Sequence, residues 1–418
     1  VVNDNEMSIA ENHGGLYQNL KELRDTEGRS SCNFFRSLGL DYLYVGEGND
    51  IPSLVAAFAK VKDTSRPTVV HIHTQKGKGY APAEADREEF HWEMPFDLET
   101  GKPKVDCSGM EDYHSLTGKF LLEKMKEDHT VVAISSGTPT VIGFTPERRK
   151  QAGRQFVDVG IAEEHAVALA SGIAAGGGRP VYGVYSTFVQ RCYDQLSQDL
   201  CINGNPAVIT VFMGTVAGMN DVTHLGFFDI PLISNIPNMV YLAPTCSEEY
   251  FAMLEWAVRQ TEYPVAIRVP GVAVVHRKEE FDTDYSELNR YKMTARGETV
   301  AILALGSFYD LGQALKNKLR EESGVEATLI NPRYITGLDE LMLEELKVGH
   351  RIVVTLEDGV LDGGFGEKIA RYYGNSEMRV LNYGLRKEFA DRYNLDELMK
   401  ANRLTDKQMA EDIAGILE

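Results

Sequence analysis

The sequence predicts three α/β units with mostly parallel, doubly wound sheets, the first of them incomplete. Apolar strand-like runs alternate with helical patterns along nearly the whole chain, which is typical of parallel sheets covered by helices on both faces. The length of 418 residues is roughly two to three times that of an ordinary domain. Hydrophobic residues make up 43% and charged residues 25%, a balance that favours a folded globular protein over a disordered one.

The elements follow one another in the order that three such units require. A strand at 68–74 closes the first unit, and residues 81–106 show little periodicity, so we interpret them as a linker that carries functional side chains. A helix near 115–126 opens the second unit, whose expected strands lie at 131–134, 180–185, 207–212, 240–242 and 265–269. Charge density rises between 272 and 294, and the last unit has expected strands at 300–305, 327–331, 352–356 and 380–383. We therefore expect domains at residues 1–110, 111–283 and 284–418.

The first residues resemble the end of a buried strand that runs into a polar turn. Neither a start methionine nor a signal-peptide pattern precedes Val1-Val2. We expect that upstream residues, in this polypeptide or in another, complete the first unit.

Composition excludes several classes of partner. Forty-three Lys and Arg against 62 Asp and Glu give a net charge of −19, and such a surface repels nucleic-acid phosphates and anionic lipid. No apolar run reaches the ~20 residues that span a bilayer. We expect no nucleic acid and no membrane as partners. The cysteines lack metal-ligand spacing and are expected to be reduced thiols of a cytoplasmic protein: Cys32, Cys107, Cys192, Cys201 and Cys246.

A polar turn follows the first strand, at the edge of an α/β sheet where ligands bind. The side-chain oxygen of Asn5 and the backbone carbonyl of Met7 suit a hard cation such as Mg²⁺. The alternative is an Asn/Asp-rich turn that caps the following helix.

A second candidate is Glu163, which a strand-like run delivers to the start of a helix that continues through Ala174. A carboxylate there could act as a general acid or base if apolar neighbours desolvate it. The alternative is a helix-start carboxylate that complements the helix dipole.

A third segment, 185–195, again runs from a strand end into a helix. Phe188 could stack on a ring, and Tyr185 and Arg191 could meet an anion; core packing and a solvated arginine are the alternatives. In a later loop, His224 could donate a proton, although a lone loop histidine is usually just solvated.

Taken together, these segments resemble the 1-deoxy-D-xylulose-5-phosphate synthase family of the transketolase superfamily. The resemblance runs along essentially the whole chain, and several dispersed motifs occur in the family's order: 3–12, 76–84 with Phe90-His91, 161–165, 185–195, Thr223-His224 and Gly363-Gly364-Phe365-Gly366. It implies a transketolase-type fold, thiamine diphosphate and Mg²⁺ as cofactors, and a homodimer.

The resemblance also implies a role for each matching residue. Family members bind Mg²⁺ and the diphosphate through a Gly-Asp-Gly loop, expected upstream of Val1, and through positions that Asn5 and the Met7 carbonyl match. Glu163 matches the carboxylate that hydrogen-bonds the aminopyrimidine, and Phe188 matches the aromatic that stacks on it. The implied catalytic residues are Glu163, His91 and His224; the implied cofactor-binding residues are Asn5, Met7, Lys76, Ile161, Glu163 and Phe188; the implied substrate residues are Tyr185, Arg191, Asn220 and His224; and the implied metal ligands are Asn5 and Met7.

Some positions depart from the family pattern. The family binds the phosphate of the acceptor aldehyde with a tyrosine, which Tyr185 matches, and with two arginines, which are Met213 and Gly271 here. An aspartate before the histidine is Asn220. The cofactor half of the pattern is therefore kept, while the half that binds the acceptor phosphate is eroded.

The sequence leaves three functions open. The leading one is a carboligase that condenses pyruvate, with loss of CO₂, with glyceraldehyde 3-phosphate or a related aldehyde. The second is a transketolase-like ketol transferase with a different acceptor. The third is a non-catalytic chain, or one subunit of a split enzyme.

Overall fold

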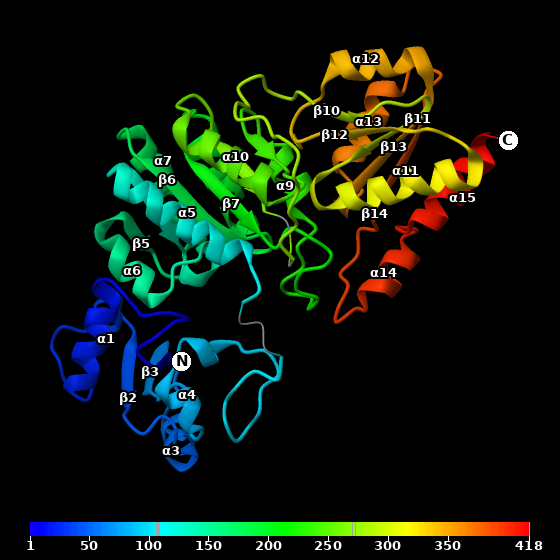
Figure 1. Ribbon diagram of the computed structural model, residues 1–418. Helices are drawn as coiled ribbons and strands as arrows, with labels where there is room; N and C mark the ends of the chain where they lie inside the picture. The colour runs from blue at the N-terminus through cyan, green and yellow to red at the C-terminus, as the bar shows by residue number, and fades with distance from the viewer. Residues whose placement is uncertain (106–108, 270, 272, 418) are drawn as a thin grey trace. The chain divides into compact units, whose positions relative to one another are not determined.

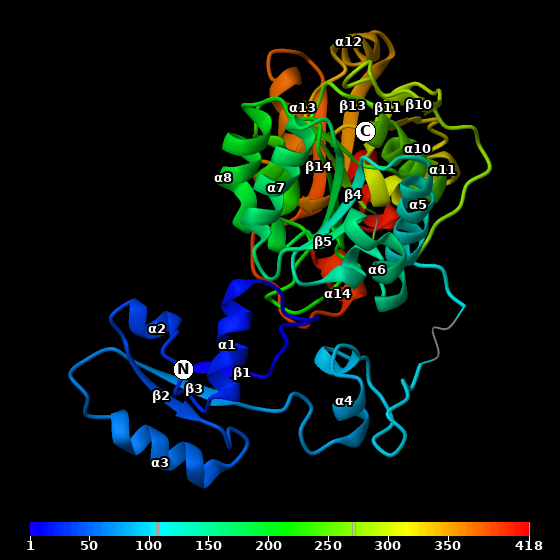
Figure 2. The same cartoon turned by 90° about the vertical axis from the view of Figure 1, so that its left-hand side faces the viewer.

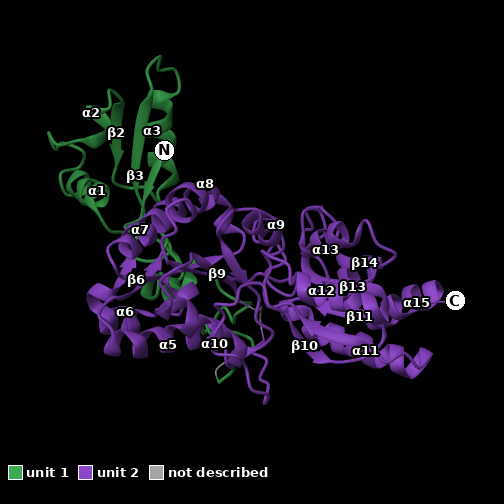
Figure 3. Ribbon diagram, turned by 90° about the horizontal axis from the view of Figure 1, so that it is seen from above, with its two compact units in different colours: residues 1–110, 136–138, 158–161 green, residues 111–135, 139–157, 162–418 purple. Residues whose placement is uncertain are grey.

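The computed structural model describes residues 1–105, 109–269, 271 and 273–417, which form two compact units (Figure 3). Unit 1 comprises residues 1–110 with 136–138 and 158–161; unit 2 comprises 111–135, 139–157 and 162–418. Cys107, the last residue of the predicted linker and the first of the charge-rich stretch lie outside the described residues. The other four cysteines are free, as expected.

Unit 1 is built on a three-stranded parallel sheet in the order β1-β3-β2. Figure 2 shows α3 alongside these strands. Its elements are β1 (Val2–Asp4), α1 (Gly15–Asp25), α2 (Phe34–Ser37), β2 (Asp41–Val45), α3 (Ile51–Val61), β3 (Thr68–His73), α4 (Ala81–Ala85) and a 3₁₀ turn at Glu89–His91.

Local sequence explains where α3 begins and what it covers. The Asp50 side chain accepts the Ser53 N–H at 2.9 Å and caps the helix, whose first turn carries a proline. Ala57 of α3 is buried in a small core with Val70 of β3 and Val45 of β2. The helix thus packs its apolar stripe on the sheet.

The first sheet of unit 2 has six strands in the order β5-β4-β6-β7-β9-β8. Its elements are α5 (Tyr113–Glu127), β4 (Val131–Ser135), α6 (Pro146–Ala152), β5 (Phe156–Asp158), α7 (Glu163–Ala175), β6 (Arg179–Tyr185), α8 (Tyr193–Gln195), β7 (Val208–Phe212), α9 (Asp229–Ser234), β8 (Val240–Leu242), α10 (Ser247–Arg259) and β9 (Val265–Arg268).

Helices cover both faces of this sheet. One face packs against α5 and α10, whose rings meet edge to face at Tyr113 and Tyr250, with centroids 5.7 Å apart. The small residues Ala166 and Ala170 of α7 are fully buried and do not belong to that core, because α7 covers the other face. All five residues of β7 are buried, as expected of a central parallel strand.

The second sheet of unit 2 has five strands in the order β10-β12-β11-β13-β14. Figure 1 shows α11 and α15 on one face of this sheet and α12 and α13 on the other. Its elements are β10 (Lys292–Ala295), β11 (Thr299–Ala304), α11 (Tyr309–Ser323), β12 (Thr328–Asn331), α12 (Glu340–Gly349), β13 (His350–Val360), α13 (Phe365–Tyr373), β14 (Arg379–Leu385), α14 (Leu395–Ala401) and α15 (Asp406–Leu417).

The predicted fold class is confirmed: parallel sheets with helices on both faces make up most of the described chain. Every expected strand is present with ends shifted by a few residues. The structure adds β2 and β10, and β10 pairs antiparallel with β12. No helix among the described residues is both long and apolar enough to cross a bilayer. Below, residues 111–283 are called the second domain and 284–418 the third domain, the division that we propose from the sequence.

Candidate active site

The predicted metal ligands of unit 1 lie in a turn at the carboxyl edge of its sheet. The parallel register of β1 and β3 pairs Asp4 with His73, so the turn follows directly at the strand ends. Asn5 Oδ1 accepts the Met7 N–H at 3.1 Å, and Asp4 Oδ1 accepts the Glu6 N–H at 3.2 Å. The next helix starts ten residues on, and no side chain caps it, so this turn satisfies its own backbone.

Lys76 and His91 gather beside the same segment. Lys76 Nζ donates to the carbonyl oxygens of Ser8 at 2.8 Å and Ile9 at 3.2 Å, so it fixes the chain just past the turn. Burial lowers the pKa of Lys76. Burial and the nearby charge of Lys76 lower the pKa of His91, which keeps that ring neutral.

Ile161 also belongs to unit 1, and 52% of its surface is exposed. It lies against Gly137, where φ is +80° and an added Cβ would come within 2.9 Å of Ile161 Cγ1. Glycine is therefore required at 137. Asp158 Oδ1 accepts the N–H groups of Gly137 and Gly160, each at 2.8 Å, and holds the two loops together.

In unit 2, Glu163 is a buried carboxylate, 3% exposed, at the first position of α7. Arg191 Nη1 donates to Glu163 Oε2 at 2.8 Å, and the same guanidinium reaches Glu164 at 3.5 Å. The sequence predicts an anion or solvent as the partner of Arg191, and the structure instead pairs it with these two carboxylates. Glu163 Oε1 accepts no hydrogen bond from the described residues.

Aromatic rings gather at the carboxyl ends of β6 and β7. The ring centroids of Phe188 lie 5.8 Å from Tyr185 and 5.4 Å from His224. Burial raises the pKa of Tyr185, so its hydroxyl stays protonated. Three residues that the sequence predicts for one site are thus in contact.

His224 is held in its loop by short-range polar contacts. Its Nδ1 lies 2.9 Å from Asp221 Oδ1 and 2.8 Å from Thr223 Oγ1, and its side chain is one-third exposed. Asn220 donates from Nδ2 to the carbonyl oxygen of Tyr393 in the third domain at 3.0 Å. The predicted substrate contact of Asn220 stays a prediction, because its amide nitrogen already has this partner.

Comparisons with known proteins add to this geometry. Two family models match: "Transketolase, pyrimidine binding domain" over residues 111–274 and "Transketolase, C-terminal domain" over residues 290–409. A protein named 1-deoxy-D-xylulose-5-phosphate synthase from Clostridium botulinum (strain Alaska E43 / Type E3) is 32% identical over 96% of this chain and 70% of its own length. Synthases of the same name from Clostridium tetani and Alkaliphilus oremlandii are 32% and 33% identical, and this chain covers 72% of each.

The chain belongs to the 1-deoxy-D-xylulose-5-phosphate synthase family.

A solved structure supports the fold of this family member. The protein titled "Split gene transketolase, inactive beta4 tetramer" superposes with a TM-score of 0.62 over 72% of this chain and 96% of its own. It is 21% identical, so the likeness concerns the fold alone.

This synthase-family chain contains a residue at the site that the sequence analysis did not single out. His114 of α5 stacks on Phe212, with ring centroids 4.7 Å apart, and lies edge-on to Tyr185 at 6.1 Å. Burial lowers the pKa of His114, and its Nδ1 lies 2.7 Å from the Val141 carbonyl oxygen. Histidine at a helix start gives no sequence signal by itself, because its partners are far along the chain.

The two positions that carry arginine in the family offer no room or charge here. A Cβ added at Gly271 would lie 2.2 Å from Thr215 Cγ2, so a larger side chain does not fit this backbone. Met213, with φ +57°, packs against the core of the second domain. Nearby cations are already paired: Arg268 with buried Asp229, and Arg277 with Asp310.

Thiamine diphosphate, on which transketolase-family enzymes depend, fits the pyrimidine side of this site. Besides Glu163, two buried hydroxyls, Ser135 Oγ and Ser186 Oγ, have no hydrogen-bond partner. They lie at the carboxyl ends of the adjacent strands β4 and β6, the edge where α/β sheets bind ligands. Among the described residues, no cluster of three His, Cys, Asp or Glu could hold a metal ion.

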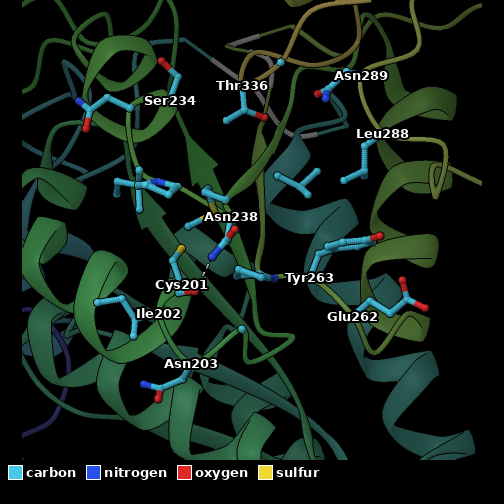
Figure 4. A pocket seen from close by; sticks show the side chains of 18 residues that line it. Cys201, Ile202, Asn203, Ser234, Asn238, Glu262, Tyr263, Leu288, Asn289 and Thr336 are labelled. Atoms are coloured by element: carbon cyan, nitrogen blue, oxygen red, sulfur yellow. Dashed lines mark hydrogen bonds between the residues drawn. The ribbon is translucent and has the colours of Figure 1, made fainter.

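A cavity of about 570 Å³ lies elsewhere in unit 2 (Figure 4). It opens at the amino ends of β8 and β9, where Asn238 Nδ2 approaches the Cys201 carbonyl oxygen at 3.4 Å. The predicted site residues lie at the carboxyl ends of β6 and β7, so this cavity is separate from them.

Proposed function

We propose that this chain catalyses the decarboxylating condensation of pyruvate with an aldehyde, as a thiamine diphosphate-dependent carboligase. The single observation that carries the proposal is the buried Glu163 carboxylate at the start of α7, with one free oxygen, in a chain whose relatives are synthases. Thiamine diphosphate, when bound, supplies the nucleophilic carbon that protein side chains lack.

Each residue of the chain then has a positioning or proton-transfer task. Glu163 would accept a hydrogen bond from a pyrimidine ring nitrogen, and Phe188 would stack on that ring. Arg191 keeps a positive charge beside Glu163 at 2.8 Å and so favours the carboxylate form. His224, with Asp221 at Nδ1, has Nε2 left to hold a proton for the aldehyde oxygen.

The diphosphate side would be held by unit 1. We propose Mg²⁺ on Asn5 Oδ1 and the Met7 carbonyl oxygen, with Lys76, His91 and Ile161 around the cofactor. The Asn5 oxygen already accepts one N–H and has a second lone pair for a cation. Calorimetry of Mg²⁺ and thiamine diphosphate binding to Asn5→Ala tests this: affinity should fall at least tenfold, and an unchanged affinity would contradict it.

The reaction is tested by following CO₂. The native protein is incubated with thiamine diphosphate, Mg²⁺ and carboxyl-labelled pyruvate, with and without glyceraldehyde or its 3-phosphate. We expect cofactor-dependent CO₂ release and a ketose product that contains both substrates. Transfer from a ketose without CO₂ would establish the ketol-transferase alternative, and neither activity would indicate a non-catalytic chain.

We also propose a homodimer in the cytoplasm, as the family resemblance implies. Light scattering of the native protein at micromolar concentration should give twice the protomer mass. A monomer would contradict the proposal.

A further inference from the structure

The loop that carries His224, residues 213–228, leaves the second domain after β7 and is buried against the third domain. We call it the His224 loop. Val216, Leu225 and Phe227 are 3%, 2% and 1% exposed and belong to the hydrophobic core of the third domain. The loop is therefore packed by a sheet other than the one from which it starts.

Hydrogen bonds from the third domain hold the backbone at the start of the loop. The Val216 N–H donates to Asp358 Oδ1 at 2.7 Å, and the Val216 carbonyl oxygen accepts the Tyr393 hydroxyl at 2.7 Å. Asp358 is itself fixed, because Ser307 Oγ donates to its other oxygen at 2.5 Å. Both polar backbone groups of Val216 thus depend on the third domain.

The middle of the loop is held by the segment before α14. Asn220 bonds twice: its carbonyl oxygen accepts the Arg392 N–H at 2.6 Å, and its Nδ2 donates to the Tyr393 carbonyl oxygen at 3.0 Å. The Val222 N–H donates to Asp391 Oδ1 at 3.2 Å. We call Asp358, Asp391, Arg392 and Tyr393 the clasp.

Asparagine at position 220 suits the clasp. An aspartate has no N–H to donate to the Tyr393 carbonyl oxygen, and its charge would face that oxygen instead. The departure from the family pattern at Asn220 thus has a structural reason within this chain.

The clasp acts on His224 through Asp221, which lies between the two clasped residues Asn220 and Val222. The His224 N–H donates to the Asp221 carbonyl oxygen at 3.0 Å, and Nδ1 of its ring lies 2.9 Å from Asp221 Oδ1. The ring is therefore oriented by a residue whose neighbours on both sides are fixed by the third domain.

We propose that Asp391 and Tyr393 are positioning residues for His224, so that the third domain sets the geometry of the aldehyde end of the site. This rests on the proposed function, in which His224 serves the aldehyde step. Loss of the clasp leaves pyruvate decarboxylation in place and weakens the use of the aldehyde.

Hydrogen exchange tests the positioning without reference to activity. In the double variant Asp391→Ala/Tyr393→Phe, exchange of the His224 amide, which bonds to Asp221 and not to the clasp, should quicken about tenfold. Asp391→Asn keeps an acceptor oxygen and should leave exchange at the wild-type rate. Tyr383→Phe is the matched control, because it removes a hydroxyl that bonds to Asp412 at 3.1 Å within the third domain. An unchanged His224 amide in the double variant would overturn the proposal.

Kinetics of the same variants test the consequence. The double variant should raise the KM for the aldehyde at least fivefold, while CO₂ release from pyruvate alone stays within twofold of wild type. Asp391→Asn should restore the KM. Faster exchange with an unchanged KM would overturn the role in the aldehyde step. If wild type releases no CO₂ from pyruvate, the proposed function fails, and the exchange result still decides whether the clasp holds the loop.

Discussion

Arg191 donates to the buried carboxylate of Glu163 at 2.8 Å, although the two residues belong to different helical segments. Glu163 is 4% exposed in its side chain and Arg191 is 49% exposed, so a half-solvated cation covers a buried anion. A carboxylate that must stay ionised in an apolar setting needs such a partner. The pair is therefore part of the machinery that prepares Glu163, and it is also a local source of stability.

The first prediction concerns catalysis. Glu163→Gln keeps the shape and removes the carboxylate, so turnover should fall roughly 10²-fold or more, the scale of general acid–base assistance. Glu164→Gln is the matched control: it lies next in the same helix start, 43% exposed, and should keep activity within about threefold. Cofactor-dependent CO₂ release measures both. Near wild-type turnover in Glu163→Gln would leave only the helix-dipole interpretation.

The second prediction concerns the stability of the pair. Arg191→Met removes a charge-assisted hydrogen bond, and solvent screening of the exposed guanidinium limits the loss to about 1 kcal/mol. Arg29→Met, which breaks an exposed pair with Glu27, should change stability by less than about 0.5 kcal/mol. Urea unfolding of each variant, and of Arg191→Met with Glu163→Gln, gives the coupling energy. Strict additivity would show that the two side chains do not interact.

The third prediction concerns the buried pair of Arg268 and Asp229, which are 4% and fully buried in their side chains and 2.8 Å apart. Asp229 also accepts the Tyr241 hydroxyl, and Arg268 donates to the Asp358 carbonyl oxygen at 2.5 Å. Asp229→Asn leaves a buried guanidinium without its counter-charge and should cost about 3–5 kcal/mol of unfolding free energy.

Asp310→Asn provides the contrast, because it breaks an ion pair with Arg277 on a side chain that is 55% exposed. That loss should stay below about 1 kcal/mol. Thermal and urea unfolding compare the two variants. Equal losses would mean that the buried pair stabilises no more than an exposed one.

Sequence predicted the strands well and the contacts poorly. Apolar runs such as 208–212 are buried on both faces, so composition alone marks them. β2 was missed because four of its five residues are only half buried, and β10 because its residues alternate little and face solvent at a sheet edge. The partners of Glu163 and His224 lie 28 to more than 160 residues away, and no local pattern encodes such pairings.

The fourth prediction concerns pH. Burial raises the pKa of Glu357 to about 7, although the backbone N–H groups of Phe365 and Gly366 donate to it at 2.7 Å each and the charges of Arg268 and Lys368 act in the opposite direction. The folded state therefore holds a proton that the unfolded state releases near pH 4.5. Stability from this group is full below about pH 4.5 and is lost as the pH rises to about 7.

Urea unfolding of wild type between pH 4.5 and 8 measures this loss, which should amount to about 3 kcal/mol at 1.36 kcal/mol for each unit of pKa. Other groups titrate in the same window, so the decisive quantity is the difference from Glu357→Gln, which has no such proton. A difference that does not change with pH would show that Glu357 is ionised throughout.

The last prediction concerns the acceptor. A phosphate dianion needs charge-assisted donors, and bidentate arginine is the usual one. Met213 and Gly271 offer none, and Arg191, Arg268 and Arg277 are paired with carboxylates. We therefore expect glyceraldehyde 3-phosphate to be a poor acceptor relative to a typical family synthase, with unphosphorylated glyceraldehyde competing.

Steady-state kinetics at fixed pyruvate compare the two aldehydes. Each lost charge-assisted contact is worth about 1.5–3 kcal/mol, so two lost contacts should bring the ratio of kcat/KM below ~10³. Restoring a cation tests the cause: Met213→Arg should raise the preference for the phosphorylated aldehyde, whereas Gly271→Arg should unfold the loop against Thr215. A preference of ~10³ or more in the unaltered enzyme would contradict the prediction, because other residues would then bind the phosphate.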